Sequence, residues 1–322
     1  MKKILVQGAN LALFAIAVLL LTVSGFSQIT LRNALDTDGD GKADLTVFRP
    51  SNNIWYTNMS NGGFSYTNFG IANDDFMTPG DYDGDGRGDV AVWRDTNGAW
   101  YRLNSSDGTF HAFFFGTTGD EPVGRDYDGD GITDFAVVRR TNGVLIWYLQ
   151  HSRDAGYDAI QWGLSTDYTA PGDYDGDGHF DVCVQRPGAS TSGQATFYAL
   201  RSSDQGVIAQ PWGLSNDLVV PGDYDGDGKT DFAVVREGAT ATSNMTWYIL
   251  RSSDNGVVAS VYGLTGTDLN VQGDYDGDGK TDLAVWRDSD GTFYYTRSSD
   301  NAFVAYPWGS PNDYPVASYD TH

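Results

Sequence analysis

Six short acidic segments carry the residues of this sequence that are best suited to chemistry. Each has Asp at positions 1, 3, 5 and 9 and Gly at positions 4 and 6, as in the segment from Asp223 to Asp231. Alternate carboxylates on a tightly curled backbone converge on one point, and glycine permits the positive φ values that such a curl needs. The spacing therefore predicts six cation sites, one in each segment.

The expected ligands are the four carboxylates of each segment and the backbone carbonyl of position 7, the latter by analogy with the EF-hand loop. In chain order the segments place these residues as follows: Asp36, Asp38, Asp40, Lys42 and Asp44; Asp81, Asp83, Asp85, Arg87 and Asp89; Asp126, Asp128, Asp130, Ile132 and Asp134; Asp173, Asp175, Asp177, His179 and Asp181; Asp223, Asp225, Asp227, Lys229 and Asp231; Asp274, Asp276, Asp278, Lys280 and Asp282. Carboxylate oxygens without a His or Cys side chain among the four select calcium over zinc or copper. We therefore expect about six bound Ca²⁺ ions.

The segments differ from EF-hands, which carry a bidentate Glu at position 12. Here position 12 is always Val, so the Asp at position 9 is expected to ligate directly; the valines are Val47, Val92, Val137, Val184, Val234 and Val285. The alternative, solvated Asp-Gly turns without metal, would leave like charges crowded together at six places. Metal binding and folding should accordingly be coupled, with the ions acting as structural parts and not as a calcium switch.

The composition supports calcium and excludes nucleic acid as a partner. The 322 residues include 43 acidic residues against 20 Lys and Arg, for a formal charge of −23, and all but two of the acids are Asp. Nucleic-acid phosphates need Lys and Arg to neutralise them. A preference for Asp and Gly over Glu favours loops and turns over helices.

The elements that must position these segments repeat with the same period. The first Asp residues lie 45 to 51 residues apart, which is the length of a propeller blade. Each unit has four extended pieces: a short strand before the acidic segment, an apolar strand such as 232–235, an aromatic strand such as that around Trp247, and a strand that ends in an aromatic-Gly pair such as Trp212-Gly213. Four strands per period predict an all-β fold, a β-propeller of six blades with a calcium loop in each.

At this point the units resemble FG-GAP/VCBS repeats, the calcium-binding blades that also occur in integrin α-chain propellers and in many secreted bacterial proteins. The pair Phe69-Gly70, followed by Thr78-Pro79-Gly80-Asp81, shows the pattern that gives the repeat its name. The resemblance covers about residues 33–320 and implies an extracellular propeller. It implies little about biological role, because the family serves adhesion, sugar recognition and scaffolding alike.

The first 27 residues are predicted to be a secretory signal peptide, and residues 28–322 a single propeller domain with a C-terminal closing strand. Lys2 and Lys3 precede the apolar run from Leu11 to Val23, and small residues follow it. The run is too short to span a bilayer comfortably, so no membrane span is expected after signal removal. The sequence contains one Cys, Cys183, so calcium must replace the disulfides that often stabilise secreted proteins.

Two further sets of residues recur in every unit. An Arg ends the apolar strand of each unit, and we expect it to pair with acids of a neighbouring loop or with carbonyls at a strand end; a basic ring for an anionic ligand is the alternative. These arginines are Arg49, Arg94, Arg139, Arg186, Arg236 and Arg287. Aromatic residues of the third strand are expected to pack between blades, with sugar stacking as the alternative.

The sequence offers seven candidate leading strands, one near residues 29–33, five between the units and one at the C-terminus from Asp313, whereas a closed six-bladed ring needs six. The C-terminal strand is expected to close the ring beside the first blade; it would otherwise begin a seventh blade, or pair with the next molecule and form a head-to-tail filament. No catalytic set is visible, so the function expected is non-enzymatic recognition or adhesion at the cell surface, with an extracellular protein or glycan as ligand. A structural subunit of an extracellular assembly is the runner-up, and a polysaccharide-active enzyme is third.

Overall fold

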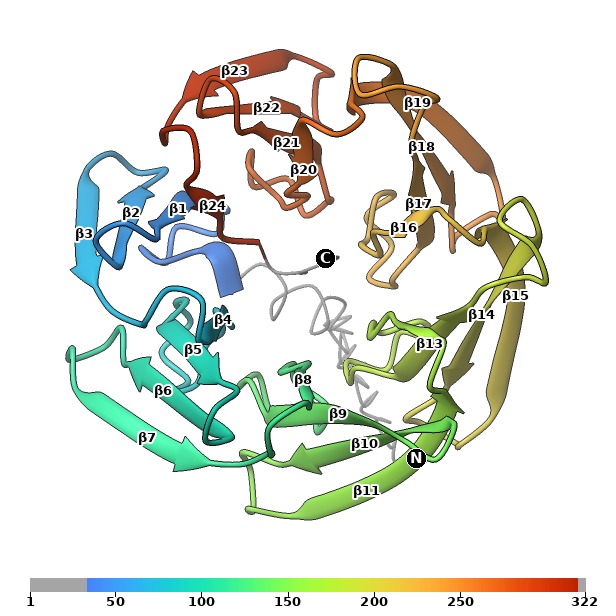
Figure 1. Ribbon diagram of the computed structural model, residues 1–322, viewed down its shortest axis with the longest axis horizontal. Coiled ribbons are helices and arrows are strands. Elements are labelled where there is room, and N and C mark those ends of the chain that lie inside the picture. Colours follow the sequence, from blue (N-terminus) through green and yellow to red (C-terminus); the bar gives the residue numbers. More distant parts are fainter. Residues whose placement is uncertain (1–33, 318–322) are drawn as a thin grey trace, which may run out of the picture.

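The chain forms a closed ring of six four-stranded antiparallel sheets (Figure 1). The structure is a computed structural model and describes residues 34–317. The signal peptide expected at residues 1–27, and the candidate leading strand near residues 29–33, lie outside the described residues. Ala34 and Leu35 are the only helical positions in the described part of the chain. The prediction of an all-β propeller with six blades is confirmed.

Each blade runs from an inner strand near the centre of the ring to an outer strand at the rim (Figure 1). The inner strands are β4 (Asp75–Met77), β8 (Glu121–Pro122), β12 (Tyr168–Thr169), β16 (Leu218–Val219), β20 (Asp268–Asn270) and β24 (Tyr314–Pro315). The second strands are β1 (Leu45–Arg49), β5 (Val90–Arg94), β9 (Phe135–Thr141), β13 (Val182–Arg186), β17 (Phe232–Arg236) and β21 (Leu283–Arg287). The third strands are β2 (Ile54–Asn58), β6 (Ala99–Leu103), β10 (Val144–Gln150), β14 (Gln194–Leu200), β18 (Asn244–Leu250) and β22 (Thr292–Thr296). The outer strands are β3 (Phe64–Asn68), β7 (Phe110–Phe114), β11 (Tyr157–Leu164), β15 (Val207–Leu214), β19 (Val257–Leu264) and β23 (Phe303–Pro307).

The C-terminal strand closes the ring by joining the first blade. Strand β24 pairs with β1, with Val47 opposite Pro315 and Phe48 opposite Tyr314, so the inner strand of blade 1 comes from the end of the chain. Blades 2 to 6 each take all four strands from one continuous stretch. This is the first of the three arrangements that the surplus strand allowed, and it leaves no seventh blade among residues 34–317.

The core consists of the second and third strands, which are buried between neighbouring blades. Trp93, Trp147, Trp247 and Trp286 are completely buried, and the third-strand aromatics Trp55, Trp100, Phe197 and Phe293 are exposed by no more than 2%. Their predicted role in packing between blades is confirmed, and they offer no surface for sugar stacking. Cys183 is likewise fully buried, in the core of blade 4.

The aromatic-Gly pair marks the place where one blade contacts the next. Gly213 has φ +76°, and a Cβ built on it would lie 2.9 Å from Cγ1 of Val234, in the second strand of the following blade. The other five glycines repeat this contact, always with the Val at position 12 of the following acidic segment. Position 12 therefore serves inter-blade packing in every unit.

Replacing Gly213 with Ala should therefore destabilise the ring. We expect Gly213→Ala to lower the free energy of unfolding by ~1–3 kcal/mol from overpacking, in addition to ~1–2 kcal/mol from the left-handed backbone. Gly143→Ala is the matched control, because Gly143 has φ +84° but a Cβ placed on it would meet no other atom within 4 Å. Denaturant unfolding in excess CaCl₂ measures both variants, and equal losses would contradict the packing role.

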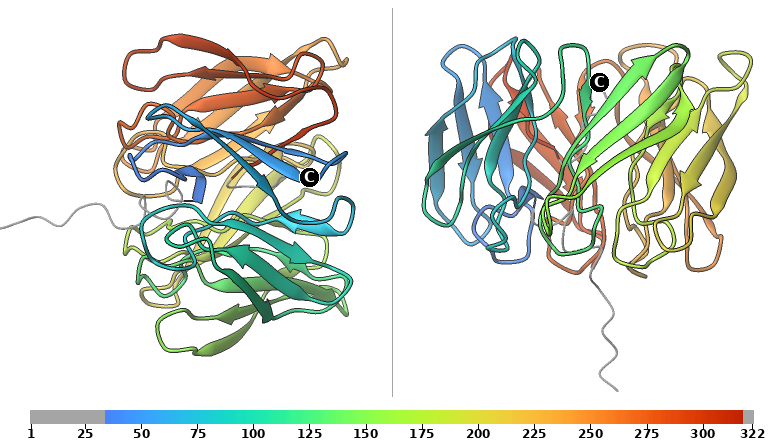
Figure 2. Two further views of the ribbon diagram at one scale, coloured as in Figure 1. Left: turned by 90° about the vertical axis from the view of Figure 1, so that its left-hand side faces the viewer. Right: turned by 90° about the horizontal axis from the view of Figure 1, so that it is seen from below.

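The strands run between two faces of the ring, and loops occupy both faces (Figure 2). Every acidic segment leads into the second strand of its blade, and in blades 2 to 6 it follows directly on the inner strand, so the fold places the segments on one face. Within residues 34–317 there is no helix with the length and apolarity that a membrane span requires.

Candidate metal centres

Each acidic loop is curled by hydrogen bonds from its backbone to its first Asp. In the first loop, Asp36 accepts hydrogen bonds from the Gly39 N–H at 2.6 Å and the Gly41 N–H at 2.7 Å. Both glycines have positive φ, of 79° and 85°. The same pattern recurs in the later loops, for example from Gly226 and Gly228 to Asp223. The curl predicted from the Asp and Gly spacing is thus present.

The curled loops bring their carboxylates together. Carboxylate oxygens of positions 1, 3 and 5 lie within 4.8 Å of one another in the first three loops, as do those of positions 1, 3 and 9 in the fourth. In three loops one oxygen at position 3 is buried and has no hydrogen-bond partner among residues 34–317; these atoms are Oδ1 of Asp128, Asp175 and Asp225. A buried carboxylate oxygen without a donor is costly unless a cation contacts it, so the residues fit a bound divalent ion.

The Asp at position 9 joins the loop to the turn between the third and outer strands. Asp231 accepts the Tyr224 N–H at 2.9 Å through Oδ2 and the Ser252 N–H at 2.7 Å through Oδ1. All six loops make both contacts, with Ser60, Ser105, Ser152, Ser202, Ser252 and Ser298 in the turns. The sequence analysis did not predict that these turns hold the Asp at position 9, although a Ser recurs at the same place in every unit and could have indicated it. Direct ligation of a metal by position 9 stays a prediction.

The turn also reaches the Asp at position 3. The Ser253 hydroxyl donates to Asp225 Oδ2 at 2.6 Å, and the same contact joins Ser106 to Asp83 and Ser299 to Asp276. The Asp225 carboxylate therefore has one oxygen held by Ser253, and its other oxygen, Oδ1, is buried with no hydrogen-bond partner in the described part of the chain. This orients position 3 for a metal.

The six loops are linked to one another in a closed circle. The N–H of position 8 in each loop donates to the carbonyl of position 1 in the preceding loop at 2.6–2.9 Å, and the last contact runs from Ala43 to Asp274. The side chain of position 7 packs over the position-4 glycine of the preceding loop, as Lys280 does over Gly226 and Lys42 over Gly277. These position-7 side chains therefore contact the neighbouring loop, consistent with the expectation that only their backbone carbonyls would ligate. The carbonyl ligation itself stays a prediction.

Burial raises the pKa of the Asp carboxyl at position 9 of every loop and at position 1 of several loops, and the charges of neighbouring Asp residues raise it further. At position 9 the pKa rises to about 6 in Asp44, Asp89 and Asp134 and to about 7 in Asp181, Asp231 and Asp282. At position 1 it rises to about 6 in Asp126 and Asp223. Without a cation these carboxyls therefore ionise at a higher pH than an ordinary Asp does, and a nearby divalent ion would favour their ionised form.

The Arg that ends each second strand pairs with an Asp of its own blade. Arg236 contacts Asp217 at 2.8–2.9 Å, and its guanidinium lies 4.6 Å from the centre of the Tyr248 ring. The same Asp accepts the Leu214 N–H next to the aromatic-Gly pair. The ion pairing that we predicted is confirmed, but the partner lies at the start of the inner strand and not in an acidic segment. The six partners are Asp75, Asp120, Asp167, Asp217, Asp268 and Asp313. The arginines are thus engaged within the fold and do not form a free basic ring.

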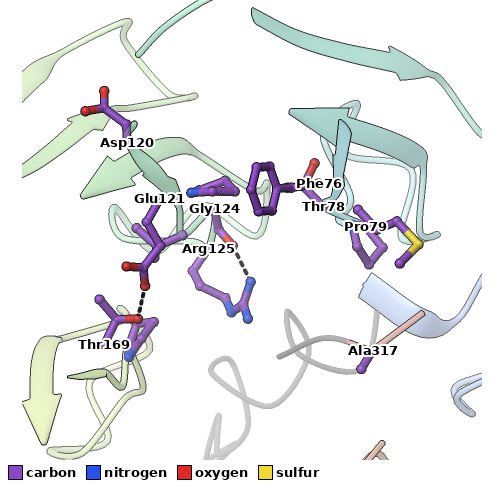
Figure 3. A pocket seen from close by; sticks show the side chains of 13 residues that line it. Phe76, Thr78, Pro79, Asp120, Glu121, Gly124, Arg125, Thr169 and Ala317 are labelled. Carbon is purple, nitrogen blue, oxygen red and sulfur yellow. Dashed lines mark hydrogen bonds between the residues drawn. The ribbon is translucent and has the colours of Figure 1, made fainter. Parts of the chain in front are cut away.

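A pocket of about 160 Å³ opens beside the inner strands of blades 2 to 4 (Figure 3). Its two acids are already in ion pairs: Asp120 contacts Arg139, and Glu121 contacts Arg140 at 2.9 Å. Glu121 also accepts a hydrogen bond from Thr169. The acids of this pocket are therefore engaged in ion pairs, and we do not count the pocket as a candidate metal centre beside the six acidic loops.

The fold and the loops together define the class of protein: a closed six-bladed β-propeller with an acidic, cation-competent loop in every blade. A family model for the FG-GAP-like repeat matches residues 36–92 and 126–184. These two stretches therefore carry FG-GAP-like repeats, which confirms the resemblance over the residues matched. A search of curated proteins gave no significant match.

Proposed function

We propose that the chain is a secreted, calcium-stabilised propeller that binds an extracellular protein or glycan and has no enzymatic activity. The observation that carries the calcium assignment is the set of buried, partnerless oxygens of Asp128, Asp175 and Asp225, each beside further carboxylates of its loop. Six Ca²⁺ ions would offset 12 of the 23 net negative charges. Extracellular calcium modules bind at about 10⁻⁴–10⁻³ M, so such loops would be filled outside a cell. FG-GAP-like repeats, which are typical of extracellular proteins, support the same location.

Exposed aromatic rings on the outer strands support a recognition role. Phe303 in β23, Phe64 and Tyr66 in β3, and Phe110 and Phe114 in β7 are each more than half exposed. These three strands belong to neighbouring blades 6, 1 and 2 (Figure 1). Exposed aromatics that gather on one side of a soluble domain are typical of protein and sugar binding surfaces. We assign ligand binding to the surface formed by these five aromatic residues of β23, β3 and β7, which we name the aromatic arc.

A binding screen in the presence and absence of calcium tests this function. Purified chain would be applied to glycan arrays and to immobilised extracellular matrix proteins, in millimolar CaCl₂ and in EGTA. We expect retention on a ligand only in calcium, and a loss of at least about tenfold in affinity for the double variant Phe110→Ser with Phe114→Ser. The matched control is Val257→Ser with Val261→Ser, which changes exposed apolar residues of β19 outside the aromatic arc. Equal losses for the two double variants would contradict the assignment.

Light scattering in the same buffers tests the structural alternative. The pairing of β24 with β1 of its own chain favours a monomer, because among residues 34–317 every inner strand is already paired within its own ring. Long polymers in calcium would favour a filament subunit in which β24 pairs with β1 of the next copy.

A further inference from the structure

Blade 3 differs from the other five in the residue that precedes the turn Ser. That residue is His151, whereas the other blades have Met59, Asn104, Arg201, Arg251 and Arg297 at the equivalent place. The side chain of His151 is 15% exposed and lies over the third acidic loop. A nitrogen donor is thus added to a site that is otherwise made of oxygens.

The imidazole faces two carboxylates of that loop. Its Nδ1 atom lies 3.5 Å from Asp134 Oδ2 and 3.9 Å from Asp128 Oδ2. The side chain of Asp134 is fully buried and that of Asp128 is 13% exposed. The three ligand atoms all lie within 4.8 Å of one another, which one small cation can span.

A carboxylate outside the loop orients the ring. Nε2 of His151 lies 2.9 Å from Oδ2 of Asp158, in the outer strand β11. If Nε2 carries the proton and donates it to Asp158, Nδ1 presents its lone pair to Asp128 and Asp134. Metal-binding His residues commonly have this arrangement, in which a carboxylate holds the far ring nitrogen. Independently, Oδ1 of Asp128 is buried and has no hydrogen-bond partner in the described part of the chain.

We propose that the third acidic loop binds a first-row transition ion such as Zn²⁺ through Asp128, Asp134 and His151, with Asp158 as the positioning residue. This inference rests on the proposal that the acidic loops hold divalent cations. Two carboxylates and one imidazole, completed by water, are a common donor set for Zn²⁺, whereas Ca²⁺ gains little from a nitrogen ligand. The other five loops keep oxygen-only donors and remain calcium sites.

Titration with Co²⁺ tests the site, because Co²⁺ accepts the same ligands as Zn²⁺ and absorbs visible light. With the full chain in excess CaCl₂, we expect a visible band that saturates at one equivalent of Co²⁺ and disappears when Zn²⁺ is added. His151→Asn should abolish the band, and Asp158→Asn should weaken Co²⁺ binding by about 10-fold. His111→Asn is the control, because His111 is an exposed residue of β7 in blade 2, outside the third loop, and should leave the titration unchanged.

A transplant into blade 5 keeps the test independent of any folding defect in the His151 variant. Arg251 and Val258 occupy the places of His151 and Asp158, since Val258 pairs with Ile249 as Asp158 pairs with Leu149. Arg251→His combined with Val258→Asp should add a second Co²⁺ equivalent. A band that survives His151→Asn, or that excess calcium removes, would overturn the inference. Calcium uptake is measured separately by equilibrium dialysis. Binding of about six Ca²⁺ without any Co²⁺ band would contradict this inference alone. No binding of either ion would contradict the calcium proposal as well.

Discussion

Chelation of calcium is expected to unfold the propeller at ambient temperature. A site with a dissociation constant of ~10⁻⁴ M stabilises the folded state by ~1.4 kcal/mol in 1 mM calcium. Six such sites give ~8 kcal/mol, which is comparable to the whole stability of an ordinary domain. The contribution is large here because no disulfide supports the ring and each loop otherwise holds crowded carboxylates.

Thermal unfolding followed by near-ultraviolet circular dichroism checks this expectation in calcium, in EGTA, and in EGTA with excess magnesium. We expect the transition to fall by tens of degrees in EGTA and to recover with calcium but not with magnesium, which demands stricter octahedral geometry. A transition that is indifferent to EGTA would contradict the assignment of the loops as structural calcium sites.

The stability of the calcium-free chain should depend on pH in the opposite direction to the stabilisation that calcium provides. Burial raises the pKa of Asp181, Asp231 and Asp282 to about 7, above the value of ~3.9 for unfolded Asp. Between these two values the folded state holds more protons than the unfolded state, so its stability rises as pH falls from about 7 toward 4. In calcium the same protonation competes with the metal, so the stabilisation by calcium should shrink on acidification. The difference between the unfolding temperatures of the calcium-loaded and the calcium-free chain should therefore decrease as the pH falls from about 7 toward 4.

The backbone hydrogen bonds between neighbouring acidic loops form a closed circle, so the six candidate metal sites are expected to be energetically coupled. The backbone of each loop is held by its neighbour, through the contact from Thr281 to Asp223 for example, and the circle is completed between Ala43 and Asp274. A metal that orders one loop therefore helps to order the acceptor of the next. We expect calcium binding and ring closure to depend on each other, which a chain of isolated loops would not show.

Much of the fold could be predicted because the sequence repeats its local rules six times. The Asp and Gly spacing fixed the curl of the loops, and the apolar and aromatic runs marked the second and third strands, as in β17 and β18. Position 12 illustrates the limit of such reasoning. The absence of Glu there showed that the loops are not EF-hands, yet the contact of Val234 with Gly213 of the preceding blade appears only in three dimensions.

The partners of the strand-end arginines were harder to predict. In a chain with 41 Asp residues, one Asp among many gives no local signal of pairing. The signal lay in the comparison of units, because the partner precedes Arg by 19 residues in blades 2 to 6, as Asp217 precedes Arg236. In blade 1 the same partner is Asp313, which lies 264 residues after Arg49. Only closure of the ring brings these two residues together.

Asp313→Ala should therefore have the largest effect of any single substitution in these ion pairs. The Asp313 carboxylate is 2% exposed and accepts two bonds from Arg49, at 2.7 and 2.8 Å, and one from the Ser310 N–H. Its removal leaves a partly buried guanidinium and a backbone N–H without their acceptor. Breaking a buried pair of this kind costs ~3–5 kcal/mol. Unlike the other five inner strands, β24 is not joined through an acidic loop to the second strand of its own blade, so loss of its pairing exposes the edge of β1.

Two matched substitutions separate the ion pair from the closure of the ring. Asp217→Ala removes the same contacts inside blade 5, where the chain continues on both sides, and should cost the pair alone. Asp204→Ala removes an exposed pair with Arg201 and should change the free energy of unfolding by less than ~1 kcal/mol. Denaturant unfolding in excess calcium ranks the three variants, and light scattering reports any self-association through the exposed edge of β1. We expect Asp313→Ala to exceed Asp217→Ala and to be the only one of the three that associates. If the losses for Asp313→Ala and Asp204→Ala were equal, β24 would not be what holds the ring closed.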